Sequence, residues 1–392
     1  MGDFNLKIGS FCINDISVLF IAINEVECIL YQTVKKMHEN IRRLFMQTTA
    51  VIYDEIDSIR IGNVTLPECA PNQLVAKTIY TFVSPGTELR VLGGHYGAAG
   101  KYPMVPGYSA ISEVVSCGSE VKGFRKGDLI SCRNSVNFAD CRAMWGGQAG
   151  MHVYDTDNEN TPVLLPEGVK DLLPYAVAEV AAISLRGVEA AYPEVGETAV
   201  VIGQGMIGQF SAMFLKMAGC KVVVCDIDEN RLAEAREAGA AATVNLKDAD
   251  AEERLQRLGN GGFDIVVEAS GVIPGIELAH KLLRRKPQNY SKDYKVEPIR
   301  FYGKDWPRLL VQANYVDKVE MDPFFFFKGE GVIVLTPFDR GVEDRQKIIE
   351  YIRSGKVDPS QFLKTVCKPE EMPEHYRKLQ RKEIISLVCD WR

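Results

Sequence analysis

The segment GQGMIG has the residue types and spacing of a turn that binds phosphate groups. It follows the apolar run TAVVI and opens a stretch with helical periodicity. Gly203 would allow the tight turn, Gly205 would let the backbone approach a pyrophosphate, and Gly208 would let helix and strand pack closely. Backbone N–H groups at Met206 and Ile207 would then face the phosphate charge. These five residues therefore predict a dinucleotide site, with a glycine turn that holds no ligand as the alternative.

An acidic residue stands where the adenine ribose would be recognised. Asp226 comes 23 residues after Gly203, at the end of the predicted strand KVVVCD. Its carboxylate would accept hydrogen bonds from both ribose hydroxyls and would repel a 2′-phosphate, which favours NAD over NADP. Arg231 would flank the adenine or soften that discrimination. Ser270, at the end of the apolar segment FDIVVEAS, is a further expected cofactor contact.

Alternating strand and helix signals surround this turn. Apolar segments typical of strands lie at residues 198–203, 221–226, 263–270 and 308–314. Segments with helical periodicity lie between them, at residues 207–218, 229–238 and 274–284. Near-continuous apolar strands separated by helices are typical of a parallel sheet covered on both faces. We therefore expect an α/β fold with a doubly wound Rossmann cofactor domain over residues 166–329.

The chain before and after this region has a different pattern. Residues 49–154 show short apolar runs rich in β-branched residues and broken by Pro, Gly and Asn, which predicts an all-β module. After Phe327 the sequence predicts a strand at GVIVLTP, a helix at residues 343–354 and a closing strand at EIISLVCDW. These elements are too few for a third domain, so we expect them to complete the first one. The expected catalytic domain spans residues 46–165 and 330–392, and a polar surface insertion lies at residues 286–307.

Residues 1–45 are interpreted as an N-terminal extension with no assigned role. Its apolar run, ISVLFIAI, has eight residues, whereas a membrane-spanning helix needs about 20. The segment also lacks the basic start and small-residue cleavage site of a signal peptide. We therefore expect a cytoplasmic protein with no membrane partner, and a weak membrane or targeting role of the extension is the alternative.

The composition excludes further classes of protein. The length of 392 residues favours two domains, and 46% hydrophobic with 25% charged residues is typical of a globular protein. Acidic residues outnumber basic ones by 52 to 46, whereas a protein that binds a nucleic acid backbone leans basic. Ten cysteines are scattered without a Cys-x-x-Cys pair. We expect reduced thiols and no nucleic acid partner.

Three motifs make the chain similar to the medium-chain dehydrogenase/reductase superfamily over about residues 47–392, with 286–307 departing from it. The segment SPGTEL at 84–89 resembles the family's Cys-Gly-Thr-Asp-Leu loop, and VPGYS at 105–109 resembles its Pro-Gly-His-Glu stretch. The segment AEV at 178–180 resembles the Ala-Glu-Pro start of a helix that carries a further ligand in polyol-type members. The resemblance implies a GroES-like, β-rich catalytic domain beside the Rossmann domain.

Departures from the family motifs concern the metal. In zinc-dependent relatives the Cys of the first motif and the His of the second bind catalytic zinc, but here Pro85 and Tyr108 stand at these positions. Glu179 alone survives, and one carboxylate does not make the three-ligand site of a catalytic zinc. Cys132 and Cys141 do not have the spacing of the family's four-cysteine structural zinc lobe. We therefore expect neither zinc site.

The same motifs supply catalytic candidates, and they are closest to a zinc-less branch that includes bacteriochlorophyllide a dehydrogenase. Thr87 occupies the family's relay-hydroxyl position. Tyr108 would polarise a carbonyl in place of the metal, and its ordinary pKa of about 10 suits a donor more than a base. Glu179 is the remaining acid/base candidate. The alternatives are a helix cap for Thr87, simple packing for Tyr108, and an ion pair for Glu179 with Arg186.

The function expected from these features is that of an NAD-dependent oxidoreductase. It would transfer a hydride between nicotinamide and a small secondary alcohol or ketone, without catalytic zinc. Two alternatives stay open. One is an enone or quinone reductase of the same superfamily, whose usual NADPH preference conflicts with Asp226. The other is a dinucleotide-binding protein without turnover. For the oligomeric state of the chain, a homodimer and a homotetramer stay open.

Overall fold

The computed structural model describes residues 7–8, 11–12, 46–284, 306–316, 318–320, 332–337 and 341–392. The chain divides into two units, Met1–Thr48 and Thr49–Arg392. In the first unit, strands β1 (Lys7–Ile8) and β2 (Phe11–Cys12) pair antiparallel. The remainder of the expected extension at 1–45, and the expected insertion at 286–307 except its last two residues, lie outside the described residues.

The cofactor domain is built on a six-stranded sheet in the order β14-β13-β12-β15-β16-β17, and every pair in it is parallel. Its strands are β12 (Thr198–Ile202), β13 (Lys221–Asp226), β14 (Ala242–Asn245), β15 (Ile265–Glu268), β16 (Arg308–Val311) and β17 (Ile333–Leu335). The intervening helices are α4 (Met206–Met217), α5 (Glu229–Glu237), α6 (Ala251–Gly259) and α7 (Ile273–Leu282). The direction of the connections reverses at β12, and open α/β sheets bind their ligands at such a switch point.

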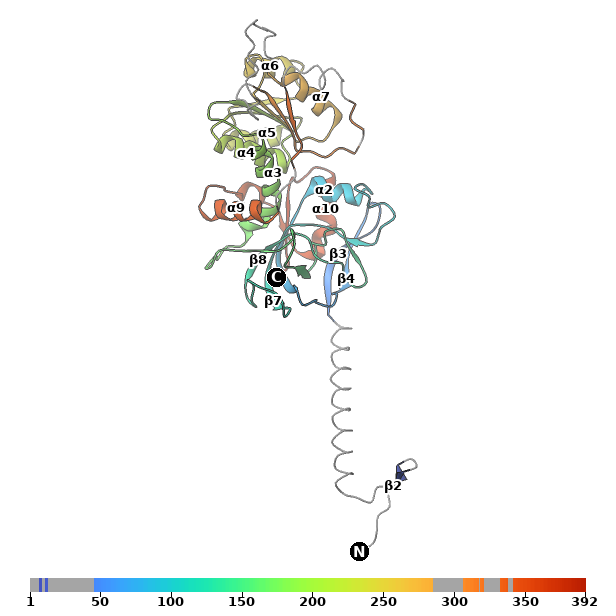
Figure 1. Ribbon diagram of the computed structural model, residues 1–392. Helices are drawn as coiled ribbons and strands as arrows, with labels where there is room; N and C mark the ends of the chain where they lie inside the picture. The colour runs from blue at the N-terminus through green and yellow to red at the C-terminus, as the bar shows by residue number, and fades with distance from the viewer. Residues whose placement is uncertain are drawn as a thin grey trace. The chain divides into compact units, whose positions relative to one another are not determined.

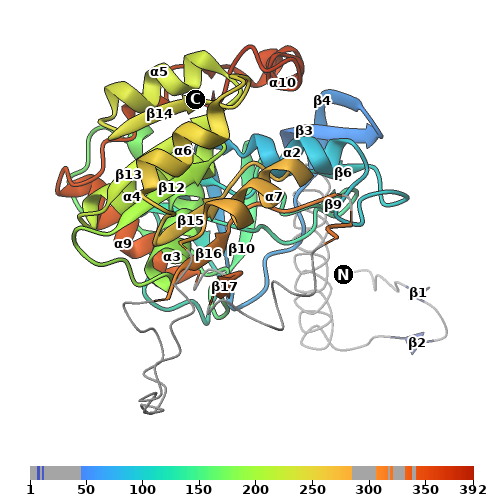
Figure 2. The same ribbon diagram turned by 90° about the horizontal axis from the view of Figure 1, so that it is seen from above.

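Both faces of this sheet are apolar because alternate residues of each strand point to opposite faces. Val222 and Val224 of β13 pack in the core cluster that contains residues of α4 and of helix α3 (Ala178–Ala190). Val223, between them, packs in a second cluster with residues of α6 and α7. Figure 2 shows α6 and α7 together along the strands. The doubly wound fold predicted from the apolar strands is confirmed.

The catalytic domain contains two antiparallel-rich sheets. One has the order β11-β8-β7-β5-β19-β18, with β10 also pairing with β5, and the other has the order β4-β3-β6-β9. The strands are β3 (Gln47–Glu55), β4 (Ser58–Thr65), β5 (Gln73–Val83), β6 (Met104–Val105), β7 (Ala110–Cys117), β8 (Leu129–Cys132), β9 (Arg142–Ala143), β10 (Met151–Asp155), β11 (Val163–Leu164), β18 (Val366–Cys367) and β19 (Leu387–Asp390). Strand β19 pairs antiparallel with the central strand β5, with Val388 opposite Phe82. The end of the chain therefore completes the first domain, as the sequence predicts (Figure 1).

Two expectations from the sequence are wrong in detail. The boundary at residue 330 is wrong because β17 pairs in parallel with β16 and so belongs to the cofactor sheet. The module predicted as all-β at residues 49–154 also contains the helix α2 (Pro85–Leu92), and the returning segment contains a second helix, α10 (Met372–Gln380), that was not predicted. Pro85 begins α2 at a position that favours proline, a signal that the β-branched run before it obscured.

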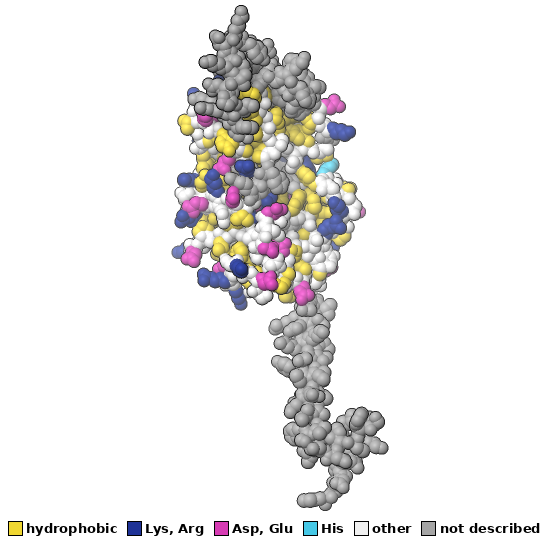
Figure 3. All heavy atoms as spheres, in the orientation of Figure 1, with side chains coloured by type: hydrophobic (Ala, Val, Ile, Leu, Met, Phe, Trp, Pro, Cys, Tyr) yellow, Lys and Arg dark blue, Asp and Glu magenta, His cyan; other side chains and the backbone are white. Residues whose placement is uncertain are grey.

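Charged side chains on the surface are mixed in sign. On the face shown in Figure 3, acidic and basic side chains are interspersed over the described residues. No helix in the described part of the chain is both long enough and apolar enough to cross a lipid bilayer.

A buried arginine joins the returning C-terminal segment to the rest of the fold. Arg345, on helix α9 (Val342–Arg353), has a fully buried side chain. Its guanidinium donates hydrogen bonds to the carbonyl oxygens of Ser131, at 3.3 Å, and Thr161, at 2.7 Å. Its Nε also lies 3.2 Å from Glu179 Oε2 on α3. Three separate segments of the chain thus share one cation.

Replacing Arg345 by Met should lower the free energy of unfolding by about 3–5 kcal/mol, because the change leaves buried polar partners without their cation. The matched control is Arg353→Met on the same helix, whose exposed side chain pairs with Glu350. That change should cost much less, because exposed ion pairs contribute little to stability. Urea unfolding of both variants checks this, and equal losses would contradict the structural role of Arg345.

Candidate active site

The glycine turn after β12 has the geometry that its sequence predicts. Gly203 has a φ of 89°, and a Cβ added there would lie 2.8 Å from the backbone of Ser270. A Cβ on Gly208 would lie 1.8 Å from the carbonyl oxygen of Gly203. A Cβ on Gly205 would meet no described atom within 4 Å. The open space beside Gly205, at the start of α4, leaves the backbone there open to approach, and the phosphate contacts of Met206 and Ile207 stay predictions.

Asp226 ends β13 with its side chain 6% exposed. Its carboxylate accepts hydrogen bonds from the backbone N–H of Gln204, at 2.5 Å, and of Asp228, at 2.9 Å. Arg231 Nη1 lies 3.8 Å from Asp226 Oδ2. A carboxylate has about four acceptor positions, so these contacts orient it and leave acceptors for ribose hydroxyls. The cofactor roles of Asp226 and Arg231 are not tested by this geometry.

Ser270 lies in the loop that follows β15, and a buried carboxylate holds that loop. Glu268 is fully buried and accepts a hydrogen bond from the Ser270 N–H at 2.8 Å and one from the Ser270 hydroxyl. The Tyr315 hydroxyl donates to Glu268 Oε2. Burial raises the pKa of Tyr315, so the phenol keeps its proton. The sequence analysis missed Glu268, although a carboxylate that ends an apolar strand is the signal that could have found it.

Tyr108 belongs to a cluster of three hydroxyl groups. Its hydroxyl donates a hydrogen bond to Ser84 Oγ at 2.6 Å and lies 3.5 Å from Thr87 Oγ1. Ser84 is the N-cap residue of α2, and Thr87 lies in the first turn of that helix. Burial raises the pKa of Tyr108 to about 12, so its hydroxyl stays protonated at neutral pH. The cluster can therefore donate hydrogen bonds, and Ser84 is a member that the sequence analysis missed.

A buried carboxylate lies directly beneath this cluster. Glu88 is fully buried, and its carboxylate accepts hydrogen bonds from the Ser84 N–H at 2.8 Å and from Gln148 Nε2 at 3.3 Å. The hydroxyl of Tyr376, on α10, donates to the same carboxylate. Burial raises the pKa of Glu88 to about 7. Glu88 stands beside Thr87 in the motif that was singled out, but its partners Gln148 and Tyr376 are distant in the sequence.

Glu179 is tied into two ion pairs. Its side chain is 1% exposed, and its Oε1 lies 2.9 Å from Arg133 Nε. Its Oε2 lies 3.2 Å from Arg345 Nε. The sequence spacing gave no sign of these two distant arginines, and the pairing with Arg186 stays a prediction. The contacts favour the ion-pair alternative, and the acid/base role of Glu179 stays a prediction without support from them.

Two helices bring the hydroxyl cluster and the glycine turn into one region. Ser109, next to Tyr108, donates a hydrogen bond to the Ala176 carbonyl at 2.7 Å, just before α3. Further along α3, Ser184 donates to the Ile207 carbonyl at the start of α4, at 3.2 Å. From α2, Arg90 Nη2 lies 2.7 Å from where a Cβ of Gly271 would stand. The catalytic candidates therefore lie next to the loops that follow the carboxyl ends of β12 and β15.

The residues at the expected zinc positions do not fit that metal. Pro85 has no ligand atom in its side chain, and the Tyr108 phenol is protonated and bonded to Ser84. Zinc sites in proteins are built from Cys, His and carboxylate ligands. Within the described ranges, no three or more such residues are placed to hold a metal ion. The lack of zinc nevertheless stays a prediction.

Comparisons with known proteins agree with this arrangement. Residues 71–166 match the alcohol dehydrogenase GroES-like domain, and residues 207–287 match the zinc-binding dehydrogenase domain. An L-threonine 3-dehydrogenase of Vibrio cholerae is 30% identical over 238 residues, which cover 55% of this chain and 67% of that protein. An L-threonine 3-dehydrogenase of Cronobacter sakazakii is 29% identical over 242 residues, covering 56% of this chain and 69% of that protein.

Solved structures of low sequence identity share the fold. A zinc dependent alcohol dehydrogenase 2 from Streptococcus pneumonia has a TM-score of 0.73 at 18% identity, covering 88% of this chain and 98% of that one. A protein described as a zinc-binding dehydrogenase from Sinorhizobium meliloti, bound to NADP, has a TM-score of 0.71 at 20% identity, covering 88% and 99%. The domain order, the glycine turn and these relatives lead to one assignment. The chain belongs to the medium-chain dehydrogenase/reductase superfamily of oxidoreductases, with a GroES-like domain and a Rossmann-type domain.

Proposed function

We propose that this chain is an NAD-dependent dehydrogenase that interconverts a secondary alcohol and its ketone without catalytic zinc. The observation that carries the proposal is the cluster of Tyr108, Ser84 and Thr87, which adjoins the dinucleotide turn. Within it, Tyr108 stands at a position where the superfamily resemblance expects a metal ligand. The relatives named L-threonine 3-dehydrogenase support the substrate class, because carbon 3 of threonine carries a secondary alcohol.

The protein's own groups would act on the substrate oxygen. A bound nicotinamide supplies or accepts the hydride. As negative charge develops on the oxygen, the protonated Tyr108 hydroxyl would turn its one hydrogen from Ser84 Oγ to the substrate oxygen. Thr87, which is partly exposed, would pass a proton between the substrate oxygen and solvent, while Ser84 keeps the Tyr108 hydroxyl beside Thr87. In this scheme Glu179 holds the fold through Arg133 and Arg345.

A panel of secondary ketones, enones and quinones tests the proposed reaction. Oxidation of NADH, followed by its absorbance, should occur with at least one saturated ketone. Reduction of enones or quinones alone, with NADPH preferred, would instead indicate a reductase of the same superfamily. No turnover with any compound, despite NADH binding, would indicate a dinucleotide-binding protein without catalysis.

The protein should bind NADH at least about tenfold more tightly than NADPH, because the Asp226 carboxylate would repel a 2′-phosphate. Asp226→Ala should narrow or invert this preference. The control is Asp248→Ala, which removes an exposed carboxylate that pairs with Arg254. Titration of both variants with each cofactor checks the preference, and equal affinity of the unaltered protein for both would contradict it.

Removing the hydroxyl of Tyr108 or Thr87 should lower turnover on the order of a hundredfold, since each would stabilise charge in the transition state. The variants are Tyr108→Phe and Thr87→Val, which nearly keep the shape of each side chain. NADH affinity should not change. Tyr154→Phe, a buried tyrosine in a separate core cluster, is the control. Unchanged turnover in both variants would return Tyr108 to a packing role.

Glu88 predicts a pH dependence of stability. Its pKa is raised from 4.5 to about 7, so the folded chain holds this proton more tightly than the unfolded chain. The resulting stability is present at low pH and is lost as the pH rises from about 4.5 through 7. Relative to Glu88→Gln, the free energy of unfolding should therefore fall by about 3 kcal/mol across this window. A difference that is the same at pH 4 and pH 8, measured by urea unfolding, would contradict the shift.

A further inference from the structure

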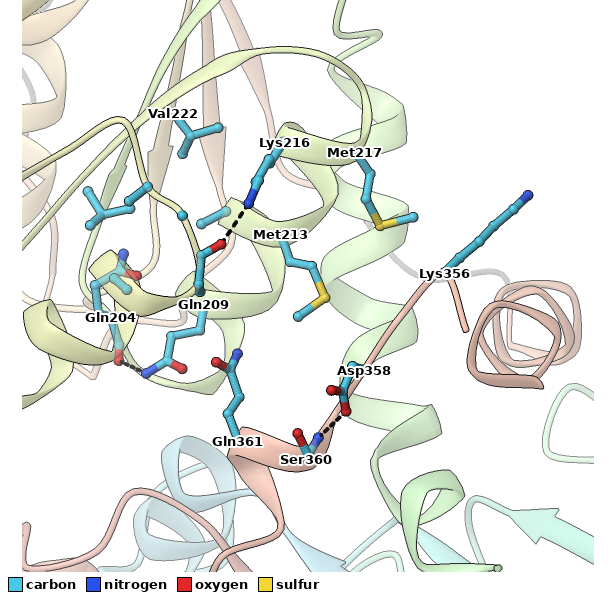
Figure 4. A pocket seen from close by; sticks show the side chains of 16 residues that line it. Gln204, Gln209, Met213, Lys216, Met217, Val222, Lys356, Asp358, Ser360 and Gln361 are labelled. Carbon is cyan, nitrogen blue, oxygen red and sulfur yellow. Dashed lines mark hydrogen bonds between the residues drawn. The ribbon is translucent and has the colours of Figure 1, made fainter. Parts of the chain in front are cut away.

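A pocket of ≈ 440 Å³ lies between α4 and α5, over β13, on the cofactor domain (Figure 4). Residues 356–361 of the returning segment lie on a further side of it. Neither Thr87 and Tyr108 nor Gly205 and Asp226 line this pocket. It is therefore separate from the candidate active site, and its volume is within the range of pockets that bind small molecules.

Small residues create this space. The α5 side is lined by Ala235, Ala238, Gly239 and Ala240, whereas Met213 of α4 lines the opposite side. Packed helices lie about 8–10 Å apart, and larger side chains normally fill the space between them. Alanine and glycine on one side leave a slot, and the flexible thioether of methionine adapts to the shape of a ligand. The walls suit a flat, apolar ring.

Two glutamine side chains stand at one end of the pocket, as Figure 4 shows. Gln204 is fully buried, and its Nε2 donates hydrogen bonds to the carbonyls of Gly203, at 3.1 Å, and Val201, at 3.4 Å. Gln209 is 6% exposed, and its Nε2 donates to the Gln204 carbonyl at 3.0 Å and to Glu234 Oε2 at 3.4 Å. Both amide nitrogens are thus committed, which fixes the amide orientation.

The two side-chain oxygens are left as acceptors. Gln204 Oε1 is buried and accepts no hydrogen bond from any residue that the structure describes. None of the described residues donates to Gln209 Oε1 either. A buried acceptor without a donor is destabilising, and a ligand with a donor would offset that cost. The polar end of the pocket therefore selects for N–H groups.

The charges around the pocket oppose a cationic ligand. Lys216 and Lys356 line it together with one carboxylate, Asp358. The Lys216 ammonium donates to the Ala238 carbonyl at 2.8 Å, and Asp358 accepts from the Ser360 N–H at 2.9 Å. Two cations beside one anion favour a donor that is itself neutral. An aromatic amino group meets this requirement.

We propose that this pocket is a second ligand site, which binds a small neutral heterocycle carrying an amino group, of the aminopurine class. The amino group donates to Gln204 Oε1 and Gln209 Oε1. The ring lies between Met213 on α4 and the alanine-rich side formed by α5. This site takes no part in hydride transfer, so its test needs no turnover.

Adenine is the probe, and purine, which lacks the amino group, is the matched control ligand. Binding is measured by calorimetry on the full chain saturated with NADH, so that the cofactor edge is occupied. Adenine should bind, and purine should bind at least about tenfold more weakly, because it lacks the donors to Gln204 Oε1 and Gln209 Oε1. Absence of adenine binding, or equal binding of the two compounds, would overturn the proposal.

Variants with a larger side chain in the pocket provide a second test of the proposed site. Ala235→Leu places a larger side chain in the slot and should weaken adenine binding at least about tenfold, whereas Ala233→Leu, on the same helix but outside the pocket lining, should not. Ala238→Leu fills the same side if Ala235→Leu does not fold. Adenine binding that is unchanged in a folded, filled variant would overturn the assignment of the site.

Discussion

The hydrogen bond from Tyr108 to Ser84 is the interaction on which the candidate active site depends. A buried phenol needs a partner, and Ser84 provides one only while the start of α2 is held in place. Glu88 holds it by accepting the Ser84 N–H. Glu88 in turn requires the Tyr376 hydroxyl from α10, near the end of the chain. The return of the C-terminal segment to the first domain is therefore part of the site.

In the cofactor domain, backbone groups rather than hydroxyl groups hold the candidate residues in place. The N–H of Gln204 fixes the Asp226 carboxylate, and the Gly203 turn is packed against Ser270. Gln204 also presents its side chain to the pocket between α4 and α5. One residue thus contacts the Asp226 carboxylate through its backbone and the proposed second site through its side chain. A ligand in that pocket would contact the same turn that positions Asp226.

Features set by local geometry could be predicted from the sequence. The turn at Gly203 and the close packing at Gly208 follow from the absence of a Cβ, and the buried parallel strands follow from their apolar runs. The GroES-like domain came from motif resemblance rather than from periodicity. The strand β17 was assigned to the wrong domain because its pairing partner, β16, lies on the other side of a long connection.

Features set by distant partners could not be predicted. Tyr376 is 288 residues from Glu88, and no spacing rule links them. Arg133 comes from the β-rich part of the catalytic domain and Arg345 from the returning C-terminal segment. Both pair with Glu179 only because the fold brings these segments together. Ser84 stood inside a motif that was recognised, but its role depends on Tyr108, which lies on another loop. The role of a buried polar group can therefore be assigned only once the fold shows which residues it contacts.

The central claim is that hydroxyl groups take the place of a catalytic metal. The most direct test measures metal content and turnover on one preparation, purified without chelator and then dialysed against one. The account predicts no stoichiometric zinc and the same turnover before and after dialysis. One tightly held zinc per chain, with turnover lost on its removal and restored by its addition, would contradict it.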